Sequence, residues 1–70
     1  MSHFGHNLRV LRQRKRLTQV QLGRLAGVSD GIVCMYERAR APATPSTGSA
    51  IALALGVILE TLTGPRLPPV

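Results

Sequence analysis

The sequence contains little cysteine, few aromatic residues and few acidic residues. Cys34 is the only cysteine among 70 residues, which rules out a disulfide within one chain and favours a reducing cytoplasm. The apolar run from Ala50 to Leu59 is too short to cross a bilayer, and no segment resembles a signal peptide. These absences argue against a disulfide-stabilised secreted protein and a membrane-spanning protein, and the length predicts a single small domain.

Residues that usually carry out catalysis are also scarce. The sequence has no phosphate-binding glycine loop, no carboxylate pair and no catalytic triad. His3 and His6 stand three positions apart, but two ligands make a poor metal site. Cys34 has Glu37 one helical turn away and no histidine nearby, so a redox-sensitive thiol is a better alternative than a nucleophile. We predict that the protein is not an enzyme and uses neither a metal nor a cofactor.

Basic residues, in contrast, are abundant. Nine Lys and Arg residues stand against three Asp and Glu residues and give a formal net charge of +6. Five of the nine fall within one window of eight residues, and these are Arg9, Arg12, Arg14, Lys15 and Arg16. This clustering favours a polyanionic partner, although a solvated helix surface remains the alternative for any one arginine. A basic helix on a membrane surface is not favoured, because no aromatic rim is available.

The segment from Gln19 to Arg38 has the pattern of two short helices that cross at a steep angle. Its apolar residues follow helical spacing on both sides of a central turn, and they are Leu22 and Ala26, then Val28, then Val33 and Tyr36. Gly23 permits close approach of the two backbones, and Gly27 suits a turn with positive φ. Ser29 is the expected N-cap of the second helix. The segment therefore predicts a helix-turn-helix.

The whole chain is expected to form five helices without strands. The predicted ranges are His3–Lys15, Gln19–Leu25, Asp30–Arg38, Pro45–Leu55 and Ile58–Thr63. Ser2, Thr18 and Thr44 are the expected N-caps of the first, second and fourth helices, and Gly56 ends the fourth. A proline-containing loop, residues 39–45, precedes the fourth helix. We expect the domain to span residues 1–63, and residues 64–70 to form an extended proline-rich tail.

Several segments resemble the Cro, phage CI and Xre-type repressor family. The matching segments are Leu8–Arg12, Leu17–Gln19, Ala26–Ser29, Tyr36–Arg38 and Ile51–Val57. The resemblance extends from about residue 3 to residue 63. It implies an all-α, lambda-repressor-like bundle of five short helices, in which the second helix of the motif enters the major groove of DNA.

The resemblance also implies contacts with the DNA backbone. The glutamine that matches Gln19 binds a phosphate in the family, at a helix N-terminus that favours anions, and Thr18 stands beside it. A capping or solvated glutamine is the alternative. Arg38 and Arg40 follow the second helix and are expected to reach the backbone on the other side of the groove, with a purely solubilising surface role as the alternative.

A structural ion pair is implied at two further positions. The family has an arginine that matches Arg12 and a glutamate that matches Glu37, and the two form a partly buried pair. Such a pair contributes little net stability when it is intact, whereas removal of one partner leaves a buried charge without compensation. We therefore expect Arg12 and Glu37 to lock the first helix to the third, with the guanidinium still able to touch a phosphate.

The outward face of the second motif helix is poor in hydrogen-bonding side chains. The residues expected to face DNA are Ser29, Asp30, Gly31, Cys34 and Met35, and none is Arg, Lys, Asn or Gln. Asp30 can accept from a cytosine amino group, or it can simply favour the positive end of the helix. Met35 or Cys34 can pack on a thymine methyl group, and Gly31 permits close approach. We therefore expect sequence-dependent DNA shape to contribute more than usual to the specificity of binding.

We predict a small homodimeric transcriptional regulator, acting as a repressor, that binds double-stranded operator DNA at the nucleoid in the cytoplasm. Apolar residues near the carboxyl end exceed the needs of so small a core, so the predicted dimer interface is Ile58, Leu59, Leu62 and Leu67. The alternative is a protein-interaction module, or an antitoxin-like component, that uses Ile32, Cys34 and Met35 to bind a protein partner.

Overall fold

The computed structural model describes residues 3–40 and 42–70. Within these ranges the chain forms five helices and no strand, and the helices are α1 (Phe4–Arg14), α2 (Gln19–Ala26), α3 (Asp30–Glu37), α4 (Pro45–Leu55) and α5 (Leu59–Thr63). Each helix begins and ends within one residue of its predicted position. Across the described ranges, none of them has the length and hydrophobicity needed to span a bilayer.

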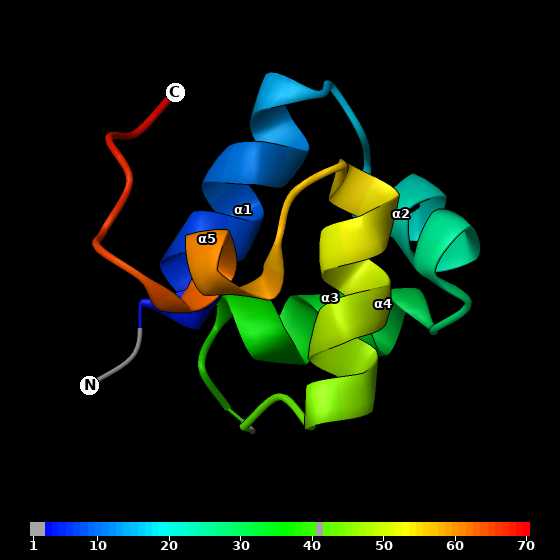
Figure 1. The fold of residues 1–70 in the computed structure, drawn as a ribbon. Coiled ribbons are helices and arrows are strands. Elements are labelled where there is room, and N and C mark those ends of the chain that lie inside the picture. The colour runs from blue at the N-terminus through cyan, green and yellow to red at the C-terminus, as the bar shows by residue number, and fades with distance from the viewer. Residues whose placement is uncertain (1–2, 41) are drawn as a thin grey trace.

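The helices pack around one another without forming layers (Figure 1). α2 packs against α3 and α4, and α1 packs against α3 and α5. α5 also contacts α4, so the chain closes back on its first helix. This arrangement leaves one small space between all five helices, and apolar side chains fill it.

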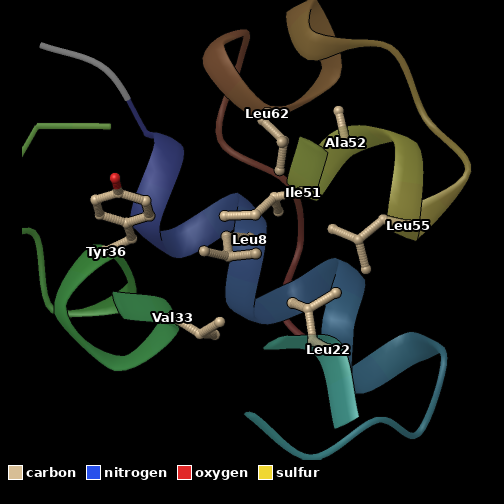
Figure 2. Packing of buried hydrophobic residues seen from close by; sticks show 8 residues of the cluster. All are labelled: Leu8, Leu22, Val33, Tyr36, Ile51, Ala52, Leu55 and Leu62. Atoms are coloured by element: carbon tan, nitrogen blue, oxygen red, sulfur yellow. The ribbon is translucent and has the colours of Figure 1, made fainter. Parts of the chain in front are cut away.

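Every helix contributes to the hydrophobic core that Figure 2 shows. The buried members are Leu8 from α1, Leu22 from α2, Val33 and Tyr36 from α3, Ile51, Ala52 and Leu55 from α4, and Leu62 from α5. Phe4 and Leu11, also from α1, pack against this core from partly buried positions. Burial of one large aliphatic side chain stabilises a fold by roughly 1.5–3 kcal/mol, so this cluster is the main source of stability.

Short-range hydrogen bonds fix where the helices begin. The Thr18 hydroxyl accepts from the N–H of Gln21 at 3.0 Å, and the Thr44 hydroxyl accepts from the N–H of Thr47 at 3.3 Å. α1 begins after His3, whose side chain makes no capping hydrogen bond. The predicted cap of that helix, Ser2, lies outside the described residues. The two threonine caps satisfy N–H groups that a helix cannot pair internally.

The tail that follows α5 is held against α1 by a buried amide. Asn7 is fully buried, and its Nδ2 donates to the carbonyl oxygens of Leu62 and Pro65 at 3.0 and 3.1 Å. Its Oδ1 accepts from the N–H of Leu67 at 2.8 Å, and Nε2 of His6 lies 2.7 Å from the Leu67 carbonyl oxygen. The tail has no regular secondary structure, but these bonds attach it to the helical bundle.

Candidate nucleic-acid interface

The turn between α2 and α3 has the geometry that its residues predict. A Cβ atom built on Gly23 would lie 2.6 Å from the carbonyl oxygen of Val28, so only glycine fits where the two backbones meet. Gly27 has φ of 74°, in the left-handed region. The Ser29 hydroxyl accepts from the N–H of Ile32 at 3.1 Å and caps α3. These contacts fix the angle between the two helices.

A reciprocal capping box closes the start of α2. Thr18 accepts from the backbone of Gln21, and the Gln21 side-chain Oε1 accepts from the Thr18 N–H at 2.9 Å. The next two N–H groups, of Gln19 and Val20, have no partner within the part of the chain that the structure describes. They stand at the positive end of the helix dipole, which favours an anion.

Arg12 and Glu37 form a two-point ion pair that joins α1 to α3. Arg12 Nε donates to Glu37 Oε2 at 2.6 Å, and Nη2 donates to Oε1 at 3.0 Å. Nη1 donates to the carbonyl oxygen of Leu17 at 2.9 Å, in the turn before α2. The side chains are only 13% and 5% exposed. The hydrogen bonds that Arg12 donates to Glu37 raise the pKa of Arg12, although burial lowers it, and the pair implied by the family resemblance is present.

The side chain of Gln19 extends this ion pair into a network. Its Nε2 donates to Glu37 Oε1 at 3.3 Å. In this structure the partly buried Gln19 amide is bonded to Glu37 and makes no capping hydrogen bond. An amide group has two N–H bonds, so one remains for a further acceptor beside the start of α2.

A small hollow opens beside this network, and we call it the arginine hollow. Its volume is about 160 Å³, and it is lined by Arg9, Arg12, Gln19, Glu37 and Arg38. Three guanidinium groups and one carboxylate give it a positive charge. The sequence placed Arg9 in the basic cluster but indicated no contact for it. Its i, i+3 spacing from Arg12 indicates a shared helix face.

The outward face of α3 is as poor in polar groups as the sequence predicts. Asp30, Gly31 and Met35 are exposed, and Cys34 is half-buried. Met35 is 39% exposed and is the large apolar side chain of this face. Ile32 is partly buried against the core. A partner at this face would therefore meet a small acidic and apolar surface rather than amide or guanidinium groups.

Arg38 and Arg40 are both exposed, but they line different hollows. Arg38 lines the arginine hollow. The backbone then turns through Ala39, whose φ of 54° lies in the left-handed region. The Arg40 N–H donates to the carbonyl oxygen of Met35 at 2.9 Å, which satisfies a terminal carbonyl of α3. The two arginines, predicted together as backbone contacts, are thus separated by this turn.

A model of a helix-turn-helix domain matches residues 3–63. The chain belongs to this helix-turn-helix family. No curated protein matches the sequence. The controller protein C.AhdI from Aeromonas hydrophila is 31% identical, with 87% of this chain and 92% of C.AhdI covered and a TM-score of 0.83.

Two further solved structures agree with the helix-turn-helix fold. The hypothetical transcription factor NHTF from Neisseria is 31% identical, with 91% of this chain and 74% of NHTF covered and a TM-score of 0.86. The P22 c2 repressor, solved in complex with a synthetic operator, is 24% identical, with 89% of this chain and 94% of the repressor covered and a TM-score of 0.82. The predicted all-α, repressor-like fold is confirmed.

The predicted dimer residues of this helix-turn-helix protein occupy different environments. Leu62 is fully buried in the core, so its place in a dimer interface was wrong. α5 turns it toward α4 rather than outward. Leu59 packs against the core beside Gly48, where a built Cβ would lie 3.1 Å from Leu59 Cδ1. Leu67 is partly buried, whereas Ile58 is 66% exposed and available to a partner.

A leucine to which the sequence assigned no role is the most exposed large apolar residue in the described ranges. Leu53 is 81% exposed, on α4 shortly before Ile58. α4 carries apolar residues all around its axis, so spacing alone does not show which of them points outward. Leu53 and Ile58 are therefore the large apolar residues that α4 and the turn after it leave most exposed.

Proposed function

We propose that this protein binds double-stranded DNA as a homodimeric transcriptional repressor, with α3 in the major groove. The observation that carries the proposal is the arginine hollow beside the free N–H groups of Gln19 and Val20. C.AhdI is a restriction-modification controller protein, and the P22 c2 repressor uses the same fold on an operator, which supports this function. Its DNA partner would place the protein at the nucleoid in the cytoplasm.

A phosphate at the start of α2 would receive several donors at once. The Gln19 and Val20 N–H groups, the second N–H of the Gln19 amide and the guanidinium groups of Arg9 and Arg38 are the donors available there. Glu37 holds Arg12 and Gln19, and it stands at the last turn of α3. The same carboxylate therefore fixes the phosphate contact relative to the helix that would read the bases.

Reading of the base sequence would rest on Asp30, Gly31, Cys34 and Met35. This face has no amide or guanidinium groups. It would distinguish base pairs by apolar contact with thymine methyl groups and by one acceptor for a cytosine amino group. Each of these is weaker than a bidentate contact with a purine. We therefore propose that groove width and bending of the operator supply part of the specificity.

A second copy of the chain would bind through Leu53 and Ile58, since these residues are 81% and 66% exposed. Burial of such side chains between two copies removes apolar surface from water and places two α3 helices on one duplex. Half-sites would then lie about one helical turn apart on a pseudo-palindromic operator.

Salt dependence tests the role of the arginine hollow. Two copies that each neutralise about three phosphates predict a loss of affinity of roughly 10³-fold between about 50 and 200 mM salt. Arg9→Gln should reduce the slope of log affinity against log salt by about 1 for each phosphate that is no longer neutralised. Arg66→Gln, in the exposed tail, is the matched control and should leave the slope unchanged. Affinity that does not change with salt would contradict the proposal.

The protein-partner alternative is favoured by one observation, the apolar outward face of α3. Met35→Ala separates the two functions, because Met35 is 39% exposed and its loss should leave the fold intact. If α3 reads bases, this variant relaxes preference at one or two base pairs of an operator selected from a random duplex pool, with an unchanged salt slope. Gly31→Arg should change the preferred sequence or add nonspecific affinity. Parent-like binding by both variants would instead favour the protein partner.

A further inference from the structure

A second and larger cavity lies between the start of α1 and the loop that follows α3, and it shares no lining residue with the arginine hollow. Its volume is about 460 Å³, within the range of small-molecule sites. The lining residues come from the start of α1, the end of α3 with the loop that follows, and the end of α5, and they are Phe4, Gly5, Tyr36, Ala39, Arg40, Pro42, Ala43 and Thr63. We call it the Tyr36 cavity. None of its lining residues is acidic.

The Tyr36 hydroxyl is the polar group that this cavity holds without a partner. The side chain is only 6% exposed, and its ring packs edge-on against Phe4 at a centroid distance of 5.9 Å. No described residue makes a hydrogen bond to its hydroxyl, yet no fully buried side-chain oxygen in the described ranges lacks a partner. The hydroxyl is therefore not fully buried, and Tyr36 is one of the residues that line the cavity. Figure 2 shows the hydroxyl pointing away from the aliphatic side chains of the core.

The remaining walls define what such a site would accept. Ala39, Pro42 and Ala43 are apolar, and the ring of Phe4 closes one side. Arg40 is the cation among the lining residues and has no ion-pair partner in the part of the chain that the structure describes. An O–H donor and a guanidinium around an apolar space match a carboxylate group on an apolar body.

We propose that the Tyr36 cavity is a binding site for small apolar monocarboxylates, such as medium-chain fatty acids. The carboxylate accepts from the Tyr36 hydroxyl and pairs with Arg40, and the hydrocarbon body lies against Phe4, Ala39 and Pro42. Gly5 forms part of the wall, and a Cβ there would overlap the Tyr36 carbonyl oxygen, so the backbones of α1 and α3 are in contact beside the cavity.

Occupancy of this site would affect DNA binding through Arg40, a consequence that rests on the proposed function. Arg40 follows α3, and its backbone N–H is bonded to the Met35 carbonyl oxygen. A carboxylate that neutralises its guanidinium removes a cation available to a phosphate. The site would thus make the affinity for DNA sensitive to apolar acids.

Titration of the ¹⁵N-labelled full chain with octanoate, followed by amide chemical shifts, tests the site without DNA. Saturable shifts are expected at Gly5, Ala39 and Thr63, with much weaker binding of octanamide, the neutral analogue, and of acetate, which lacks the apolar body. Tyr36→Phe removes only the unpartnered hydroxyl and should weaken octanoate binding about tenfold. Arg40→Gln should weaken it several-fold, whereas Arg24→Gln, an exposed control on α2, should not.

The outcomes separate this proposal from the proposed function. No saturable shift, equal binding of octanamide, or shifts centred on Leu53 and Ile58 would overturn the carboxylate site whatever the DNA affinity. Octanoate binding by a protein that shows no salt-dependent affinity for duplex DNA would support the site and refute the DNA-binding function. Where both hold, octanoate should weaken duplex binding by the parent and not by Arg40→Gln.

Discussion

Replacing Asn7 with leucine is expected to lower the free energy of unfolding by about 3 kcal/mol, because it leaves several buried and partly buried polar groups without their partner. Leucine has nearly the same size, so the loss comes mainly from hydrogen bonds rather than from a cavity. The carbonyl oxygens of Leu62 and Pro65 lose their donor, and the Leu67 N–H loses its acceptor. In a domain this small the loss corresponds to a fall in Tm of roughly 12–24 °C.

Circular dichroism during thermal and urea unfolding measures this effect. Gln13→Leu is the matched control, since it replaces an exposed amide on the same helix and should change stability little. Hydrogen exchange supplies a local readout, because the Leu67 amide should lose its protection in the Asn7 variant. Similar stability of the two variants would mean that Asn7 does not hold the tail in solution.

Glu37→Ala is expected to lower the free energy of unfolding by a similar amount, about 3 kcal/mol. The variant leaves the Arg12 guanidinium, 13% exposed, without its two-point partner and also removes the acceptor of the Gln19 amide. Desolvation of an unpaired charge costs more than the intact pair contributes, so the effect exceeds that of losing a surface ion pair.

The controls for this second prediction use exposed charges. Glu60→Ala and Arg40→Ala remove a charge from exposed positions, and each should lower Tm only slightly. The double variant Arg12→Leu with Glu37→Leu should be more stable than Glu37→Ala, because it removes both buried charges. A Glu37→Ala variant that melts together with Glu60→Ala would show that the ion pair contributes nothing to holding α1 on α3.

The helices and the turn of the motif were predictable because their determinants are local. Thr18, Ser29 and Thr44 each bond an N–H three positions later, and Gly27 adopts its positive φ in a turn that its neighbours define. Such interactions depend on short spacing alone. The pairing of Arg12 with Glu37 spans 25 positions, and only the resemblance to a family supplied it.

Other features of the candidate sites depend on how the helices pack, and the spacing of residues along the sequence does not determine that packing. The sequence does not distinguish Leu53, Leu59 and Leu62. In the fold, packing of α5 on α1 and α4 buries Leu62, whereas Leu53 on α4 stays exposed. The sequence shows Asn7 only as a polar residue on a basic helix. Its role depends on the tail, which packs beside it in the fold. The loop after α3, which the sequence predicted only as a break between helices, forms much of the wall of the Tyr36 cavity.

The long reach of Asn7 has a consequence for how the protein is made. The amide and its partners Leu62 and Leu67 are separated by 55 and 60 positions, so α1 is synthesised before either partner. At about 5–20 residues per second, the partners follow roughly 3–12 s later. During that time the Asn7 amide stays bonded to water, and α1 lacks the contacts that bury it. Folding of this domain is therefore completed from its carboxyl-terminal side, after residue 67 has been synthesised.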